Sequence, residues 1–413
     1  MTLEVFLSRS RLLRRLRSGP FAEVIDLYTD QLRQGGYPSG YAAHAFRLIN
    51  HFGRWLIDHS LHPGDVDEQL VARFLTAHAQ CRVQTGADHS VMGRLLAILR
   101  AARVIGPPLP LLLNPVEQLL EDYQGYLQRK LGLSPTTTLI YSRYLRPFLR
   151  SLALNRADDI ARITATDFIH YIEEHAGDGS PATAGAFCSR LRSFLRYLSA
   201  EGLIAKDLSV YVPSVKMWSQ AGLPAYLSKT QVEQVLQCGE RTTAKDRRDY
   251  AVLLLLARLG LRANEVALLA LDDIDWRAGH IHVQGKGRKG ATMPLLPEVG
   301  EAIAAYLCDG RPVSESRRVF LRSYAPHIGF ASSCAVIHIA RRAIKAANVT
   351  GVAHRGSHLF RHSLATELLG SGATLSEIGQ VLRHQNHDTT RIYAKVDLAS
   401  LRHLAAPWPG AMQ

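Results

Sequence analysis

Cysteine is scarce in this chain, and long apolar runs are absent. Its 413 residues include five cysteines, scattered along the chain, and none of them forms a C-x-x-C pair. An odd, scattered set argues against a disulfide framework or a zinc ribbon and suits a reducing compartment. The longest apolar runs, such as AVLLLLA at 251–257, are far shorter than the roughly 20 residues that span a bilayer. We therefore expect no membrane segment and a cytoplasmic protein.

Acidic residues are also few relative to basic ones. The chain has 36 Asp plus Glu against 49 Lys plus Arg, which gives a formal charge of +13 and a pI near 9.7. A basic surface keeps many proteins soluble, but it also concentrates phosphate and steers polyanions toward the protein. The charge is therefore compatible with two interpretations: a nucleic-acid partner, or a basic surface that only keeps the protein soluble.

The first 19 residues, MTLEVFLSRSRLLRRLRSG, are rich in arginine and amphipathic. Such a stretch is compatible with an organelle transit peptide, whereas Glu4 and the lack of a small-residue cleavage site argue against a secretory signal. We favour a basic surface helix that touches DNA.

An internal repeat with an offset near 95 residues organises the first half of the chain. The stretch 27–56 aligns with 122–152, which matches Tyr28 with Tyr123, and RLLAILR (94–100) aligns with RLRSFLR (190–196). Apolar residues three and four apart predict amphipathic helices, and Gly and Pro separate these helices. Each copy therefore reads as a bundle of about four short helices, although two unrelated helical domains could also align to this extent.

Two joints divide the chain into three predicted domains. GPPLPLLLNP (106–115) is a proline-rich joint between the two copies, and a second joint runs through 210–228. After it, buried helices are followed by HIHVQGKGRKGATMPLL (280–296), two alternating segments around a Gly-Lys turn that predict a β-hairpin. We expect a mainly α protein, with helical domains at 1–108 and 114–210 and an α+β domain with a small sheet at 222–405.

The C-terminal third contains four short segments whose residues suit phosphodiester chemistry. In GLRANE (260–265), Arg262 and Glu265 are three residues apart, so the carboxylate can hold a guanidinium that binds phosphate bidentately. A surface ion pair is the ordinary alternative. The hairpin tip GKGRKG carries Lys286, Arg288 and Lys289, which suit contact with a DNA strand or a solvated basic turn equally well.

The third segment is SHLFRHSLAT (357–366), in which His358 and His362 lie one helical turn apart. The metalloprotease pattern needs a glutamate directly after the first histidine, and Leu359 fills that place, so we predict no metal site. Arg361 between the histidines indicates an anion instead. The fourth segment, LRHQNHDTTRIYAKV (382–396), places His384 nine residues before Tyr393, with a polar break that lets the tyrosine turn back toward the histidine. A core histidine and a core tyrosine are the alternative.

The order Arg-x-x-Glu, lysine hairpin, His-x-x-Arg-His, His and Tyr resembles the tyrosine recombinase (phage integrase) family over about residues 225–400. The copy at about 114–208 looks like the family's SAM-like core-binding domain. The resemblance implies two tandem helical domains of this type before a catalytic domain. Two departures stand out: Phe360 replaces the usual leucine before Arg361, and Arg383 stands where glycine commonly precedes the histidine.

By position, the resemblance implies a role for each of the following residues. Arg262 and Arg361 would clamp the phosphate, and Glu265 would support them. Lys286 would protonate the leaving 5′ oxygen, while His358 and His384 would assist proton transfer, with His358 the candidate base. Tyr393 would be the nucleophile. We assign DNA binding to Arg288, Lys289, Arg190 and Arg192.

The chemistry explains why these residue types are needed. Attack on a phosphodiester builds negative charge, which fixed arginine donors stabilise, and a tyrosine of pKa about 10 needs cations and a proton acceptor. A 3′-phosphotyrosyl product preserves the phosphodiester energy, so a second strand can attack it without ATP. We therefore expect a recombinase that needs no cofactor and no metal.

The resemblance implies double-stranded DNA as the partner and a homodimer to tetramer on paired DNA sites. We expect a prokaryotic, nucleoid-associated enzyme that integrates, excises or transposes a mobile element, with the first domain extending the DNA clamp. Two alternatives stay open: a type IB-like topoisomerase, and a non-catalytic DNA-binding regulator.

Overall fold

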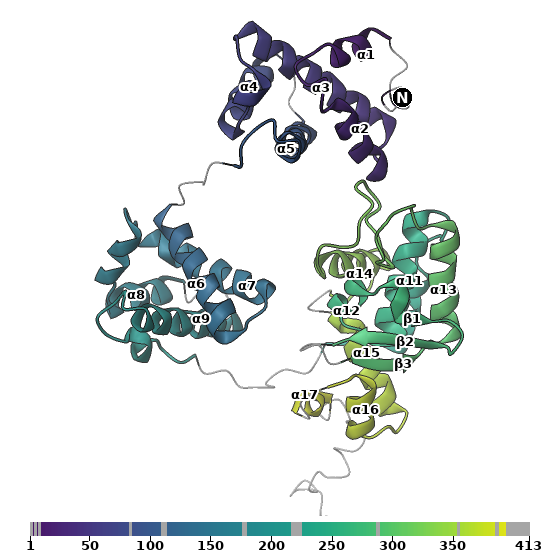
Figure 1. The fold of residues 1–413 in the computed structure, drawn as a ribbon. Coiled ribbons are helices and arrows are strands. Elements are labelled where there is room, and N and C mark those ends of the chain that lie inside the picture. Colours follow the sequence, from purple (N-terminus) through teal and green to yellow (C-terminus); the bar gives the residue numbers. More distant parts are fainter. Residues whose placement is uncertain are drawn as a thin grey trace, which may run out of the picture. The chain divides into compact units, whose positions relative to one another are not determined.

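The structure, a computed structural model, divides into compact parts that are described separately below (Figure 1). Met1–Pro107 and Gly222–Gln413 belong to one compact unit, and Pro108–Ala221 forms another. The residues that the structure describes are 3, 6, 10–81, 85–108, 114–175, 180–215, 225–285, 290–352, 356–384 and 388–393.

The N-terminal part is a helical bundle with its own core. Its buried residues include Tyr28, Leu32 and Phe52, each fully buried. The helix α1 lays Leu16 onto this core and keeps Arg11 on its exposed side, as its amphipathic sequence predicts. The five helices are α1 (Ser10–Arg17), α2 (Ile25–Gln34), α3 (Ser39–Asp58), α4 (Glu68–Cys81) and α5 (Gly86–Ala101).

The middle part is a second helical bundle, and the residue types at its helix starts explain why the helices begin there. Asn114, Ser134 and Ser180 each accept a hydrogen bond from a backbone N–H in the first turn, and each is followed by proline at the first helical position. The four helices are α6 (Pro115–Leu131), α7 (Pro135–Ser151), α8 (Ala165–His175) and α9 (Pro181–Ala200).

The residues that the repeat aligns occupy equivalent core positions in the two bundles. Tyr123, the partner of Tyr28 in the alignment, is fully buried, and so are the matched Leu127 and Phe148. Arg94 stacks over Tyr37 with 4.3 Å between its Cζ atom and the ring centroid, and the aligned Arg190 stacks over Tyr144 at 4.8 Å. The two copies therefore share a packing scheme, while three independently folding domains stay a prediction.

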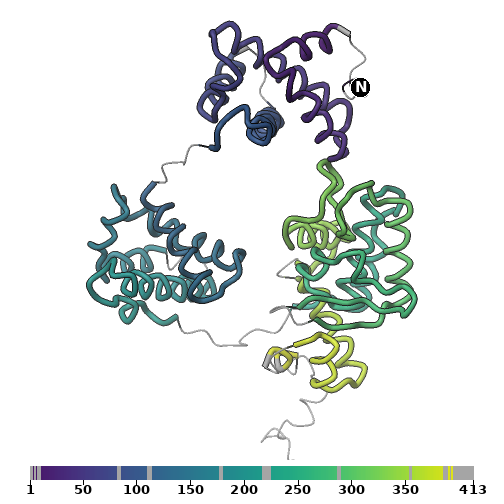
Figure 2. Tube along the Cα trace, in the orientation of Figure 1, coloured from purple at the N-terminus to yellow at the C-terminus, as the bar shows by residue number. Residues whose placement is uncertain are grey.

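The C-terminal part is built around the apolar helix α11, whose residues 251–257 are all buried. The helices α13 and α14 pack beside α11 (Figure 1). The small lobe of α16 and α17 follows α15 along the chain trace (Figure 2). The helices are α10 (Lys229–Gln237), α11 (Ala244–Arg258), α12 (Ala263–Leu268), α13 (Pro297–Asp309), α14 (Cys334–Ala346), α15 (His358–Gly370), α16 (Leu375–Val381) and α17 (Asp388–Arg391).

The predicted hairpin is present and belongs to a three-stranded antiparallel sheet of order β1-β2-β3. The strands are β1 (Ile274–Asp275), β2 (His280–Gln284) and β3 (Gly290–Pro294), with Ile281 paired to Met293. Ile281, Val283 and Met293 face the core, whereas the alternate residues of β2 are exposed. The expected mainly α fold with a small sheet is thus confirmed. Within the described residues, no helix has the length and apolar character needed to cross a membrane.

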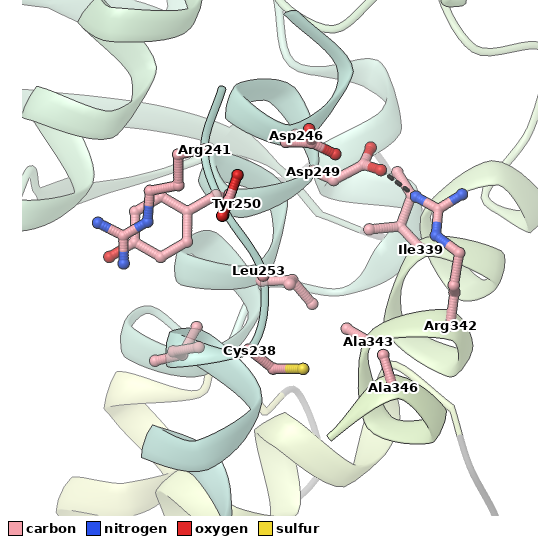
Figure 3. Close-up of a pocket in the computed structure, with 13 residues that line it drawn as sticks. Cys238, Arg241, Asp246, Asp249, Tyr250, Leu253, Ile339, Arg342, Ala343 and Ala346 are labelled. Carbon is pink, nitrogen blue, oxygen red and sulfur yellow. Dashed lines mark hydrogen bonds and ion pairs between the residues drawn. The ribbon is translucent and has the colours of Figure 1, made fainter. Parts of the chain in front are cut away.

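A buried ionic group ties α11 to its neighbours. Asp249 accepts hydrogen bonds from Arg248 at 2.7 and 3.0 Å and from Arg342 of α14, and Arg248 also donates to the Leu321 carbonyl at 2.8 Å. Asp249 and Arg342 line a hollow of about 190 Å³ (Figure 3), and none of the predicted catalytic residues lines it. The Arg248 side chain is only 8% exposed, and Asp249 provides its counter-charge.

We predict that Asp249→Asn destabilises the C-terminal part by about 3 kcal/mol, because it leaves a buried guanidinium without its counter-charge. Calorimetric unfolding of the full chain checks this as a downward shift of one transition. Asp272→Asn is the matched control, because Asp272 forms an exposed ion pair with Arg317 and should leave all transitions in place. Equal shifts in both variants would contradict the prediction.

Candidate active site

The predicted catalytic residues of the C-terminal part come from the ends of its helices. Arg262 caps the start of α12, His358 opens α15, and Arg361 lies in the first turn of α15. His384 follows the end of α16, and Tyr393 follows α17. Helix ends carry backbone N–H and C=O groups without intrahelical partners. Side chains at these positions therefore lie next to polar backbone groups that can bind them.

Arg262 and Glu265 are joined by a capping box rather than by a shared helical face. The Arg262 backbone is extended, and its N–H donates to Glu265 Oε2 at 2.8 Å while its Nη1 donates to Oε1 at 2.9 Å. The Glu265 carboxylate is 4% exposed and the Arg262 side chain 33% exposed. The carboxylate therefore fixes a guanidinium that still reaches solvent.

Arg361 is held by backbone carbonyls. It is 4% exposed, and its Nη1 donates to the Gly260 carbonyl at 2.6 Å while Nη2 donates to the Leu382 carbonyl. Burial first, and then repulsion from Arg262 and Arg383, lowers the pKa of Arg361 to about 10, so it stays charged at neutral pH. Gly260 has φ +57° and packs closely against Leu364 and Leu382, which explains glycine there.

His384 is placed by the turn that ends α16. Its backbone N–H donates to the Gly379 carbonyl at 2.9 Å, and the N–H of Arg383 donates to the Gln380 carbonyl at 3.0 Å. These two bonds, with Arg383 at φ +55°, form a Schellman motif. The His384 ring shares a hydrogen bond of 2.7 Å with Thr390 Oγ1 through Nδ1. Its orientation is therefore fixed from two sides.

Tyr393 lies against the histidines and is almost fully buried, at 1% exposure. Its hydroxyl is 2.8 Å from Nδ1 of His362, and its ring is stacked with that of His384 at a centroid distance of 6.3 Å. Burial raises the pKa of Tyr393, and Arg361 lowers it in part. A neutral His362 whose Nδ1 carries no proton would accept the hydroxyl's proton.

Sequence reasoning named His358 as the candidate base and did not single out His362 as a partner of Tyr393. Among the described residues, the hydrogen-bond partner of the Tyr393 hydroxyl is His362, and the His358 ring lies beside His362 at a centroid distance of 6.4 Å. The i, i+4 spacing was a visible signal, but its only interpretation was a metal pair. Within the described residues, no three His, Cys, Asp or Glu side chains group as a metal site.

The remaining predicted residues are on the hairpin tip and in the middle bundle. Lys286, Arg288 and Lys289 lie outside the described residues. Arg190 donates to the Ala186 carbonyl at 2.7 Å and stacks on tyrosines, and Arg192 donates to the Val212 carbonyl at 3.2 Å and the Pro213 carbonyl at 2.8 Å. Both arginines therefore hold their own bundle together, and their contact with DNA stays a prediction.

The electrostatic balance of the site is positive. Arg262 and Arg383 pair with the carboxylate of Glu265, and Arg361 lies close enough to be influenced by its charge; we call these three arginines the arginine cluster. Partial burial, followed by the nearby charges of Arg361 and Arg262, lowers the pKa of His384 to about 4. The pKa values of His358 and His362 are lowered by the same kinds of cause. Such a site attracts an anion and keeps its histidines neutral, ready to accept protons.

Comparison with known proteins decides the family. Residues 225–399 match the phage integrase family, and residues 120–202 match the phage integrase N-terminal SAM-like domain. The protein y4rA of Sinorhizobium fredii, named as an integrase/recombinase, is 37% identical over 413 residues, covering 100% of both chains. The chain belongs to the phage integrase family of tyrosine recombinases. Tyrosine recombinases cut and rejoin DNA strands, so this tyrosine recombinase is an enzyme of that class.

Other relatives agree with this membership. The tyrosine recombinase XerC of Oceanobacillus iheyensis is 29% identical over 297 residues, covering 70% of this chain and 95% of its own. The solved structure of the site-specific recombinase XerH bound to difH in a post-cleavage complex has a TM-score of 0.55 at 21% identity, covering 73% of this chain and 99% of that one. At that identity, the likeness confirms the fold.

We predict that stability falls as the pH drops from 7 to 5. The pKa of His384 is lowered in the folded state, so between about 6.5 and 4 the unfolded chain binds a proton that the folded chain does not. His384→Gln removes this difference, and its unfolding temperature should fall less over the same pH range. His338→Gln, an exposed histidine on α14, is the control and should behave as wild type. A parallel loss in all three proteins would contradict the prediction.

Proposed function

We propose that this tyrosine recombinase is a site-specific integrase that cuts and rejoins DNA through a 3′-phosphotyrosyl intermediate, without a metal ion or ATP. The observation that carries the proposal is the Tyr393 hydroxyl 2.8 Å from His362 Nδ1, beside a buried Arg361. A tyrosine placed only for packing also needs an acceptor for its buried hydroxyl, but it does not need a surrounding cluster of cations. Here the acceptor is an imidazole, and the cluster of cations is present.

In the proposed reaction, Tyr393 Oη attacks the scissile phosphorus while its proton passes to His362 Nδ1. The new P–O bond to tyrosine replaces the bond to O5′, and the departing 5′ oxygen takes a proton, for which Lys286 is the candidate donor. Arg262 and Arg361 stabilise the charge that builds on the non-bridging oxygens. The 5′-hydroxyl of a second strand then attacks the phosphotyrosyl ester and restores a phosphodiester, so no external energy is consumed.

The relatives support the rest of the proposal. Integrase/recombinase names recur among them, and a lambda integrase tetramer bound to a Holliday junction shares the fold, with a TM-score of 0.52. We propose that this chain likewise acts on duplex DNA as a dimer to tetramer on paired sites, and serves the integration, excision or transposition of a mobile element.

We predict that Tyr393→Phe abolishes covalent protein–DNA adducts. Phenylalanine keeps the buried ring and removes only the nucleophilic oxygen, so folding and DNA binding should be retained. The check is to express both proteins in the host cell, trap adducts under denaturing conditions and sequence the attached DNA. Adducts at one recurrent sequence support a site-specific recombinase, whereas scattered sequences indicate a topoisomerase. Binding without adducts in wild type would indicate a regulator.

We propose that the N-terminal part extends the DNA clamp through α1. This helix carries Arg11, Arg14, Arg15 and Arg17 and no acidic residue in its first turn. Its leucines pack on the core, so Arg11, Arg14 and Arg15 are left exposed on one side of the helix. A row of exposed guanidinium groups on a fixed helix suits phosphate contacts that do not read base sequence.

We predict that replacing Arg11, Arg14 and Arg15 together with glutamine weakens DNA binding and flattens its salt dependence. Losing three phosphate contacts should reduce the slope of log K against log salt by about 2.7. Fluorescence anisotropy with a labelled duplex at several salt concentrations measures the slope. The control replaces three exposed arginines of other elements: Arg73, Arg156 and Arg277. An equal loss in the control would show that α1 is not a special contact.

A further inference from the structure

Arg383 occupies a backbone conformation that arginine rarely adopts. Its φ of +55° lies in the left-handed region, at the position of the Schellman motif that glycine usually fills. The backbone bonds from Arg383 to Gln380 and from His384 to Gly379 require only this conformation, not an arginine side chain. Strained residues persist where their surroundings hold them, and they concentrate at functional sites. The arginine side chain therefore calls for an explanation of its own.

The side chain turns inward to the site. It is 14% exposed, and its Nη2 donates to Glu265 Oε2 at 2.8 Å. Its Nη1 contacts the Met293 sulfur on β3, the strand that leads away from the lysine hairpin. One guanidinium thus joins the turn after α16 to both the carboxylate that serves Arg262 and the sheet.

The turn that the Arg383 side chain anchors also contacts Arg262 and Arg361. The carbonyl of Leu382 accepts from Arg361 Nη2, and the carbonyl of Arg383 lies 3.5 Å from Arg262 Nη2. Two successive carbonyls therefore face the two arginines, and the Arg383 side chain fixes the turn that presents them. The second oxygen of Glu265 is also fixed, so the carboxylate cannot rotate away from Arg262.

We propose that Arg383 is a positioning residue: by anchoring the turn after α16 on Glu265, it aims Arg262 and Arg361 at the scissile phosphate. The proposal rests on the strand-transfer function proposed above. It assigns to this chain a third arginine, which acts through Glu265 and does not touch the DNA. A purely structural role for Arg383 would predict effects on stability alone.

The test uses the purified full-length protein and the duplex recovered by adduct trapping, nicked near the scissile phosphate so that cleavage is irreversible. R383M keeps the length of the side chain and loses its charge, R383K keeps a charge, and R383G suits the left-handed backbone. We expect R383M and R383G to lower the maximum single-turnover rate of adduct formation by about 10- to 100-fold. R383K should stay within about fivefold of wild type, and R317M, on the exposed ion pair with Asp272, should not change the rate.

Three further readouts separate positioning from stability and from direct DNA contact. The DNA concentration giving half the maximum rate should change less than threefold. The unfolding temperature of R383G should exceed that of R383M, because both variants lose the ion pair with Glu265 while glycine also relieves the strained φ. The double variant E265Q/R383M should be no slower than E265Q alone, since both act on Arg262 through one contact. Losses that multiply in the double variant would overturn the proposal, and so would rates of R383M and R383G within threefold of wild type.

A DNA-free measurement keeps this proposal separate from the proposed function. Inorganic phosphate, at an ionic strength matched with sodium chloride, should raise the unfolding temperature of wild type by occupying the arginine cluster. R383M should need about tenfold more phosphate for the same shift, while R317M should not. If wild type forms no adducts but the phosphate arms differ as expected, the strand-transfer function fails and the positioning role stands. Equal phosphate responses in wild type and R383M would overturn the positioning role.

Discussion

The site depends on one buried carboxylate. Arg262, Arg361 and Arg383 would repel one another within a small volume, and Glu265, 4% exposed, pairs with two of them. Its two oxygens leave it no freedom to serve one arginine without the other. The same side chain also accepts a hydrogen bond from the Arg262 backbone N–H at the start of α12. Glu265 therefore fixes the beginning of this helix and balances the charge of the site at the same time.

Around this carboxylate, the chain builds its chemistry from helix ends rather than from helix faces. The start of α12 orients Arg262, the first turn of α15 carries Arg361, and the turn after α16 sets His384. The interior of α11 supplies the apolar support, and its own ionic group lies elsewhere, at Asp249. The apolar packing is thus supplied by α11, and the candidate catalytic side chains by helix ends. Each segment needs to meet only one of the two requirements.

The sequence predicted the features that depend on local order. The hairpin follows from alternation around glycines, and the ion pair of Arg262 with Glu265 from their spacing. What it could not predict depends on packing between distant segments. The Tyr393 hydroxyl bonds to His362 and not to His358 because of how α16 folds back on α15. The spacing of residues in the sequence does not reveal this packing.

Charge patterns show the same limit. Arg190 and Arg192 are predicted to bind DNA, and the sequence could not show that their guanidinium groups also bind carbonyls of their own bundle. Arg383 stood out only as a departure from the common glycine, because a sequence shows the unusual residue but not the carboxylate that pairs with it. For the hairpin residues Lys286, Arg288 and Lys289, which lie outside the described residues, the sequence remains the sole source of the assignment.

The burial of Tyr393 has a consequence for how such an enzyme coexists with a chromosome. Tyr393 is 1% exposed and packs with Ile378, Leu382 and its histidine neighbours, so in the proposed reaction it would be a nucleophile that starts out covered. The proposed reaction conserves bond energy, so no fuel step can act as its safeguard against random nicking. In the proposed reaction that safeguard would be the burial itself, because the binding energy of an engaged duplex would have to meet the cost of exposing the tyrosine. DNA that binds only briefly would then dissociate before a phosphodiester bond could be cut.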